Sequence, residues 1–363
     1  MTRTIHVLVA AGGTGGHIFP GLAVGQELAS AGHDVTFAGT RDGMEADLVA
    51  RAGFSMEYLT VGKLKRMSLT ARLRSLALLP SAVSRAIQMV TKVAPDVVVG
   101  AGGYVAAPIV VAAWIRRIPV ILLEQNAIAG ATNRHLARLA TKVVIAFDRA
   151  TERLPESKAV ACGNPVRPAL VERLSVPRRP SDRTRLLILG GSQGARALND
   201  VMVKLTPVLG RYDMEIRHQT GRADFDWVQA AYRKWDVAAE VLPFIEDMAS
   251  VYEQTDLVLC RAGATTIAEL TVAGLPSLLV PFPYAADDHQ NANAAVLADA
   301  GAAVLVPQRE LTVPRIEAEL ARFRGDGRLL ERMGHAAKLL GKPDAAACVV
   351  TLCHELVGLR AEA

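Results

Sequence analysis

The apolar run IHVLVA, residues 5–10, leads directly into a turn that contains four glycines, Thr14 and then His17 (AAGGTGGHIFP, residues 10–20). Clustered glycines cost backbone entropy on folding, so they indicate a tight turn or a ligand that approaches the backbone closely. The same layout returns in RLLILGGSQG, residues 185–194. Two such strand-to-glycine turns predict two similar α/β domains that face one another, with each turn at the carboxyl end of a strand.

Short β-rich runs alternate with helical stretches in both halves of the chain, as in DVTFAG, DVVVGA and PVILLE. This alternation predicts βαβ units and parallel sheets, and therefore an α/β fold of two Rossmann-like domains. The Pro- and Arg-rich stretch after residue 164 is the predicted linker. We place the domains at residues 1–164 and 165–342, with a C-terminal helix at 343–363 that packs back across the hinge.

Common nucleotide-binding fingerprints do not fit these turns. A G-x-G-x-x-G pattern read from Gly13 meets Ile18 where a third small residue is needed, and neither turn carries the G-K-[ST] of a P-loop. Backbone amides at strand ends remain able to hold phosphate or sugar oxygens, and GAGGY, residues 100–104, adds a third turn at the same predicted edge. The alternative is that all three are only tight turns.

The four cysteines show no CxxC and no paired framework, so we interpret them as buried thiols in a reducing cytosol. Residues 97–115 carry no charge and are long enough to suggest a membrane span. Three glycines and Pro108 interrupt this stretch, which favours a buried strand followed by a buried helix.

Two motifs in the second half point to a sugar nucleotide. In RAGATTIAEL, Thr265 or Thr266 can cap a helix and Glu269 can accept hydrogen bonds from a ribose diol, although a capping box from Thr266 to Glu269 explains the pattern equally well. The polar stretch PFPYAADDHQNAN, residues 281–293, suits a loop that contacts sugar hydroxyls. Its acidic residues are adjacent in sequence, and adjacent side chains rarely converge on one ion, so no metal site is predicted.

The ordered set GGTGGHIFP, GAGGYVAAP, EQNAIAGATNR, GNPVRP, GGSQGAR, RAGATTIAEL and DDHQNANA resembles one bacterial family over nearly the whole chain. Members of that family add N-acetylglucosamine (GlcNAc) from UDP-GlcNAc to undecaprenyl-pyrophosphoryl-MurNAc-pentapeptide, which converts lipid I to lipid II in peptidoglycan synthesis. The resemblance implies a GT-B architecture, with the acceptor in the N-terminal domain, the donor in the C-terminal domain and no cofactor. It also implies other proteins of cell-wall synthesis as partners.

Site residues carried over by this resemblance fall into two groups. The donor group binds uracil, ribose, diphosphate and GlcNAc hydroxyls; a relative can carry Gln where this chain has His289. The acceptor group closes over the sugar and the lipid diphosphate. These implied substrate-binding residues are Arg167, Ser192, Ile245, Ala264, Thr265, Thr266, Glu269, His289 and Gln290 for the donor, and Thr14, Gly15, Gly16 and Asn126 for the acceptor side.

An inverting transfer needs a base for the acceptor hydroxyl and an offset for the charge of the leaving UDP. His17 at the rim of the first glycine turn is the candidate general base, and Glu124 is the rival. Helix N-termini and Arg167 can offset the leaving charge without a metal ion.

The first 164 residues are basic and the remainder is slightly acidic. Between Glu57 and Asp96 every charged residue is basic, and leucines there repeat at helical spacing until Pro80 interrupts them. This pattern predicts peripheral docking on an anionic membrane at the cytoplasmic face, and no recognition motif for nucleic acid accompanies it. The predicted membrane residues are Leu69, Arg72, Leu73, Leu76 and Trp114.

Two alternatives remain at this point. A UDP-GlcNAc 2-epimerase would keep the donor site and need no lipid-facing surface. A non-catalytic membrane scaffold or sugar-nucleotide sensor would bind UDP-GlcNAc without turnover.

Overall fold

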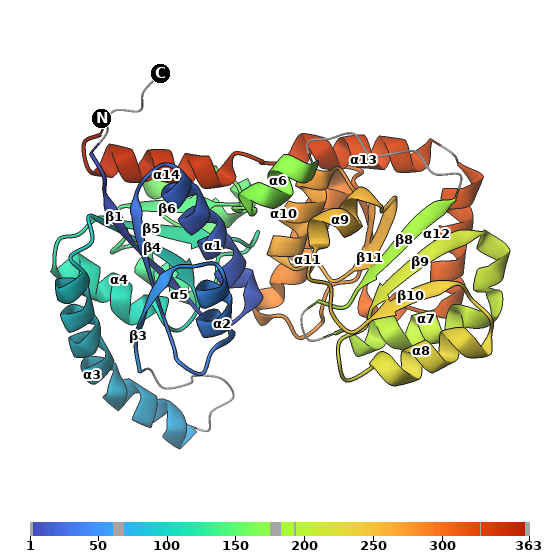
Figure 1. Cartoon of the computed structure of the whole chain (residues 1–363), viewed down its shortest axis with the longest axis horizontal. Helices are drawn as coiled ribbons and strands as arrows, with labels where there is room; N and C mark the ends of the chain where they lie inside the picture. Colours follow the sequence, from blue (N-terminus) through green and yellow to red (C-terminus); the bar gives the residue numbers. More distant parts are fainter. Residues whose placement is uncertain (1–2, 61–68, 175–182, 192–193, 327, 360–363) are drawn as a thin grey trace. The chain divides into compact units, whose positions relative to one another are not determined.

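A computed structural model describes residues 3–60, 69–174, 183–191, 194–326 and 328–359 (Figure 1). By its contacts the chain divides into two compact units: Met1–Pro168 together with Lys342–Ala363, and Ala169–Gly341. The chain therefore leaves the first unit at Pro168 and re-enters it at Lys342, and Arg167 belongs to the first unit.

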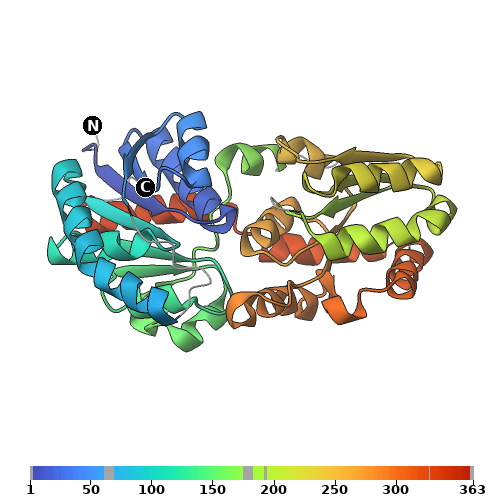
Figure 2. The same ribbon diagram turned by 90° about the horizontal axis from the view of Figure 1, so that it is seen from below.

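The first unit is built on a parallel sheet of seven described strands in the order β3-β2-β1-β4-β5-β6-β7. Helices α1 and α14 cover one face of this sheet with apolar side chains, and α3, α4 and α5 cover the other. Helix α3 packs beside α4 (Figure 2). The bounds are β1 His6–Ala11, α1 Gly15–Ser30, β2 Asp34–Gly39, α2 Met44–Arg51, β3 Ser55–Tyr58, α3 Leu69–Val93, β4 Val97–Gly102, α4 Ala106–Ile115, β5 Val120–Glu124, α5 Ala131–Leu136, β6 Lys142–Ile145, β7 Ala159–Val160 and α14 Ala345–Leu356.

The second unit carries a parallel sheet of six described strands in the order β10-β9-β8-β11-β12-β13. Side chains of α7, α8, α12 and α13 form its main apolar core against one face of the sheet. Helix α6, Pro168–Leu174, begins at the boundary between the units. The remaining bounds are β8 Thr184–Leu189, α7 Arg196–Leu209, β9 Met214–Gln219, α8 Phe225–Lys234, β10 Ala239–Leu242, α9 Met248–Glu253, β11 Leu257–Cys260, α10 Ala264–Ala273, β12 Ser277–Leu279, α11 His289–Asp299, β13 Ala303–Leu305, α12 Val313–Gly325 and α13 Leu329–Leu340.

The predicted fold class, two Rossmann-like parallel-sheet units, is confirmed. The uncharged stretch at residues 97–115 forms strand β4 and helix α4, as expected from its glycines. No helix among the described residues is long and apolar enough to cross a membrane. Helix α3 runs through Pro80, so the expected interruption there is wrong.

The interpretation of all four cysteines as unpaired thiols is wrong. Cys162 and Cys348 form a disulfide, whereas Cys260 and Cys353 are buried and free. The two bonded residues lie 186 positions apart in sequence, and their Cα atoms come within 5.8 Å because α14 returns to the first unit. Sequence spacing cannot reveal a contact that depends on this return.

Candidate active site

The first glycine turn joins β1 to α1 within three residues. Thr14 is the extended N-cap residue, and its carbonyl accepts hydrogen bonds from the amides of His17 (3.0 Å) and Ile18 (3.1 Å). Gly13 has a φ of +98°, in the left-handed region that favours glycine. Thr14, Gly15 and Gly16 therefore lie at the N-terminus of a 16-residue helix, where the helix dipole favours an anion.

The third glycine turn makes room for the first. A Cβ added to Gly102 would lie 2.5 Å from Nδ1 of His17, and a Cβ added to Gly103 would collide with the carbonyl oxygen of Gly12. Both glycines also have positive φ angles, +105° and +81°. The GAGGY sequence is thus explained by close packing against the His17 ring and the Gly12 backbone.

Glu45 forms a hydrogen bond with the first glycine turn. This residue was not identified from the sequence. Its carboxylate is fully buried. It accepts hydrogen bonds from the amide of Gly13 (3.4 Å) and from the amide (3.0 Å) and hydroxyl (2.7 Å) of Thr40. In the sequence Glu45 is simply an acidic residue in the first turn of a short helix, which is most often exposed.

Glu124 organises the loop that follows β5. Its side chain is only 2% exposed. Its carboxylate accepts hydrogen bonds from the amide (3.0 Å) and side-chain nitrogen (3.3 Å) of Asn126, the amide of Gly130 (3.0 Å) and the side chain of Asn133 (2.9 Å). These bonds fix Asn126 in the loop at the carboxyl end of the strand.

Arg167 lies against helix α1 of the first unit. Its guanidinium stacks over the ring of Phe19, 5.2 Å from the ring centroid. The same ring packs on Gly15, where an added Cβ would be 3.0 Å from Phe19 Cε2. A positive charge is therefore held beside the first glycine turn.

In the second unit, β11 leads into α10 through a small-residue turn. The helix begins at Ala264 with Gly263 as its N-cap, so Thr265 and Thr266 lie inside the first turn and neither is the cap. A capping box from Thr266 to Glu269 is therefore excluded. Glu269 is instead 8% exposed, and its Oε2 accepts a hydrogen bond from the Tyr252 hydroxyl at 3.0 Å.

The loop before α11 is held by its own polar groups. Gln290 Oε1 accepts from the amide of Phe282 at 2.9 Å, and His289 Nδ1 donates to the carbonyl of Ala286 at 2.7 Å. Asp287 and Asp288 both have positive φ angles, +51° and +55°. These angles lie in the left-handed region, which aspartate adopts more readily than most residues other than glycine.

Of the other predicted donor residues, Ile245 is 7% exposed in the segment after β10. Ser192 lies outside the described residues.

A buried network of hydrogen bonds links β9, α7 and α8 in the second unit. His218 Nε2 donates to Oδ1 of Asn199 at 3.0 Å, because the Asn199 side-chain nitrogen already donates to the Thr220 carbonyl and to Asp224. Nδ1 then accepts from the hydroxyl of Tyr232 at 3.1 Å. Burial lowers the pKa of His218 to about 3, so the ring is neutral.

Asp224 belongs to this network and is buried. It is the N-cap position of α8 and is 9% exposed. Burial raises its pKa, but hydrogen bonds from Trp227, Asn199 and Arg196 outweigh burial, and the net pKa is lowered. These hydrogen bonds therefore stabilise the charged form of the buried carboxylate.

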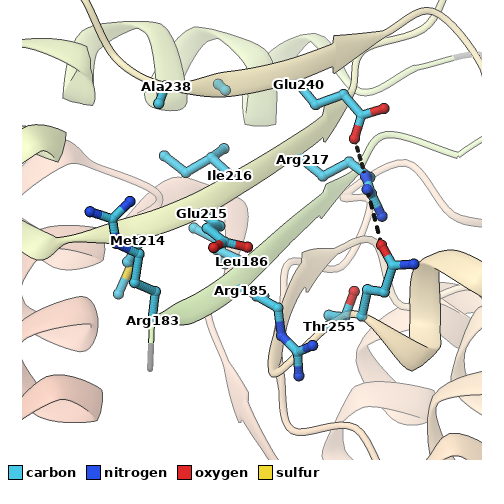
Figure 3. A pocket seen from close by; sticks show the side chains of 12 residues that line it. Arg183, Arg185, Leu186, Met214, Glu215, Ile216, Arg217, Ala238, Glu240 and Thr255 are labelled. Carbon is cyan, nitrogen blue, oxygen red and sulfur yellow. Dashed lines mark hydrogen bonds and ion pairs between the residues drawn. The ribbon is translucent and has the colours of Figure 1, made fainter. Parts of the chain in front are cut away.

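A polar cavity of about 530 Å³ lies at the amino ends of β8, β9 and β10 (Figure 3). Arg217 there pairs with Glu240, and Arg185 pairs with Asp256 at 2.8 Å. The candidate donor residues follow the carboxyl ends of strands, at the opposite edge of the sheet. This cavity is therefore distinct from the candidate donor site.

Comparison with known proteins assigns both units to one family. The glycosyltransferase family 28 N-terminal domain matches residues 7–145, and the family 28 C-terminal domain matches residues 185–349. The chain is 44% identical over 360 residues to a protein of Anaeromyxobacter sp. (strain K), covering 98% of this chain and 94% of that one. That protein is named UDP-N-acetylglucosamine–N-acetylmuramyl-(pentapeptide) pyrophosphoryl-undecaprenol N-acetylglucosamine transferase. The chain belongs to this branch of glycosyltransferase family 28.

Two further members of the family support this assignment. A transferase of the same name from Methylococcus capsulatus is 43% identical over 352 residues, covering 97% of this chain and 99% of the relative. The crystal structure of MurG from Acinetobacter baumannii is 35% identical with a TM-score of 0.78, covering 97% of this chain and 99% of that one. The resemblance seen in the sequence motifs, and the GT-B class it implied, are confirmed.

A UDP-GlcNAc 2-epimerase from Neisseria meningitidis, bound to UDP-GlcNAc, has a TM-score of 0.69 at 16% identity, covering 97% of this chain and 100% of that one. A likeness at this level of identity shows the shared fold alone, so it does not favour an epimerase over a family 28 transferase.

Proposed function

We propose that this chain is an inverting glycosyltransferase that moves GlcNAc from UDP-GlcNAc to the C4 hydroxyl of MurNAc in undecaprenyl-pyrophosphoryl-MurNAc-pentapeptide, which converts lipid I to lipid II. The observation that carries the proposal is the 44% identity, over 98% of the chain, to a transferase named for this reaction. The positions of the candidate residues in each unit support it.

The first unit binds the acceptor in this proposal. The N-terminus of α1 at Thr14, Gly15 and Gly16 offers the positive end of a helix dipole. Arg167, which the resemblance assigns to the donor diphosphate, stacks on Phe19 in this same unit and adds a full charge beside that helix end. A diphosphate is the part of a lipid-linked sugar that this chemistry suits best.

His17 acts as the general base. Its ring is held by close packing against Gly102, and an imidazole can accept the hydroxyl proton as the oxygen attacks the anomeric carbon. Glu124 is the weaker candidate, because its buried carboxylate already accepts four hydrogen bonds, from Asn126, Gly130 and Asn133.

The second unit binds the donor. Ala264, Thr265 and Thr266 form the first turn of α10, whose dipole can offset charge on the leaving diphosphate. The neighbouring roles are uracil at the Ile245 backbone, ribose at Glu269, and a further contact with the donor at Ser192. GlcNAc hydroxyls meet His289 and Gln290.

A cofactor has no place in this scheme, and a bound metal is not needed to offset the leaving charge. We therefore expect a metal chelator to leave the rate of transfer unchanged within about twofold. Rates measured with EDTA and after addition of Mg²⁺ check this. A chelator-induced loss that Mg²⁺ restores would contradict it.

We also propose that the protein docks on the cytoplasmic face of the bacterial membrane. Trp114 is 54% exposed and Ile115 is 47% exposed at the end of α4, and Arg116 and Arg117 follow them. Exposed tryptophan beside cations suits a membrane interface. Leu69, Arg72, Leu73 and Leu76 lie in α3, which packs beside α4, but their side chains are outside the described residues.

The test is UDP release by the purified protein from UDP-GlcNAc, with and without a short-chain lipid I analogue. The proposal predicts release only when the analogue is present. Release without any acceptor would point to an epimerase or a hydrolase. Binding of UDP-GlcNAc without release under either condition would leave a sensor or scaffold.

A further inference from the structure

Tyr252 makes a hydrogen bond that the sequence motifs did not point to. It lies in α9 and is 1% exposed, and its hydroxyl donates to Oε2 of Glu269 in α10 at 3.0 Å. Helix α9 is itself fixed: the Asp247 side chain accepts from the amide of Ser250 at 3.1 Å, and Arg173 pairs with Asp247 and Glu253. Tyr252 therefore contacts Glu269 from a helix whose position is itself fixed by a hydrogen bond and two ion pairs.

Such a bond restricts what the carboxylate can do. A glutamate side chain has three rotatable bonds, and ordering a long side chain of this kind costs up to ~2 kcal/mol of conformational entropy. An ionised carboxylate is only an acceptor, so the tyrosine hydroxyl must be the donor and Oε2 the anchored oxygen. The anchor selects one rotamer of Glu269 before any ligand arrives.

We infer that Tyr252 is a positioning residue for recognition of ribose: it holds Glu269 in the orientation that accepts hydrogen bonds from the 2′- and 3′-hydroxyls of a uridine nucleotide. The inference rests on the proposed donor role of Glu269. It adds a residue from a different helix to that role and predicts a measurable consequence for sugar discrimination.

The decisive variant is Tyr252→Phe, which removes the hydroxyl and retains the buried ring. Without this anchor, Glu269 must be ordered when the ligand binds, which costs up to ~2 kcal/mol, or up to roughly 30-fold in affinity. We expect UDP affinity to fall by ~5-fold to that limit, and the affinity for 2′,3′-dideoxy-UDP, which lacks both hydroxyls, to fall by no more than about twofold. The preference for UDP over 2′,3′-dideoxy-UDP should therefore shrink. KM for UDP-GlcNAc should rise more than kcat falls.

Two further variants make the result specific. In a Glu269→Gln background, Tyr252→Phe should have no additional effect on the preference, because the anchored charge is already absent. Tyr212→Phe is the matched control: it removes a hydroxyl that donates to the Glu317 carbonyl in the same unit, 3.4 Å away, and should leave the preference unchanged.

Calorimetric titrations with both nucleotides, together with thermal unfolding, decide the outcome. An equal loss of affinity for UDP and 2′,3′-dideoxy-UDP in Tyr252→Phe, whether from weaker binding or from a smaller folded fraction, would overturn the inference. So would an unchanged affinity for both. If the unmodified protein binds neither nucleotide, the proposed donor site itself fails, which is a separate result.

Discussion

The His17 ring is confined by its neighbours, since Gly102 leaves just enough space beside Nδ1. A base held in this way contributes to the chemical step without contributing to donor binding. We predict that His17→Ala lowers kcat by ~10² or more and leaves the Kd for UDP-GlcNAc nearly unchanged. Steady-state kinetics and calorimetry measure the two quantities.

The exposed His135 of α5 provides the control for this prediction, because His135→Ala removes an imidazole from the same unit. It should leave kcat unchanged. A His17→Ala enzyme with normal turnover would remove His17 from the base role and return attention to Glu124.

His218 gives a prediction at acid pH. Its pKa is about 3 in the folded protein and 6.5 in the unfolded chain, so between these values the unfolded state binds a proton that the native state does not. The free energy of unfolding should therefore decrease by ~1.4 kcal/mol per pH unit, from this residue alone, as the pH falls below 6.5.

Urea unfolding at several pH values tests this. His218→Gln should remove that contribution to the slope, and His335→Gln, at an exposed position, should not. Equal slopes in His218→Gln and the unmodified protein would contradict the account.

Candidate site residues could be named from the sequence where a local pattern carried their chemistry. The glycines around Thr14 and the RAGATTIAEL motif led to His17 and Glu269 directly from the sequence. Glu45 and Tyr252 were not predictable in the same way. Their partners, Gly13 and Glu269, lie 32 and 17 residues away, and the contacts exist only after the helices have packed.

At the scale of elements, the end of β4 and the turn that follows it determine how much space the His17 ring has. Gly102→Ala would place a Cβ against the His17 ring and would also strain a φ of +105°. We predict a fall in kcat of ~10-fold or more, with little change in the Kd for UDP-GlcNAc, because the displaced ring loses its orientation.

Gly53→Ala separates the two causes. Gly53 has a φ of +79° in the same unit, but nothing lies within 4 Å of its added Cβ. The Gly53→Ala variant should have a lower melting temperature, because of backbone strain, and an unchanged kcat. Equal kinetic effects in the two variants would show that strain, and not the contact with His17, explains Gly102→Ala.

Strong strands such as β1, β4 and β5 were predictable because both of their faces are buried and their sequences are continuously apolar. Strands β3, β7 and β13 were missed. Strand β3 is SMEY with no buried residue, and the other two are only two and three residues long, so hydrophobic periodicity has too few positions to register.

At the scale of the whole molecule, the chain crosses between its units twice, and the disulfide between Cys162 and Cys348 ties together two segments of the first unit that flank those crossings. A cross-link between distant residues restricts the unfolded chain, typically by 2–4 kcal/mol. Cys162→Ser should therefore lower the free energy of unfolding by about that amount under non-reducing conditions.

Thiol titration of the denatured, unreduced protein gives an independent check. Two free thiols, from Cys260 and Cys353, are expected, and four should appear after reduction. Four thiols without reduction would show that the expected bond does not form, and Cys162→Ser should then have little effect on stability.

The central claim is an inverting transfer to a specific hydroxyl, and the product tests it most directly. Purified protein, UDP-GlcNAc and a short-chain lipid I analogue should yield a disaccharide whose new bond is β-configured and joins GlcNAc to the C4 oxygen of MurNAc, as read by NMR. An α-configured bond, a different linkage, or release of a free sugar in place of the disaccharide would contradict the account.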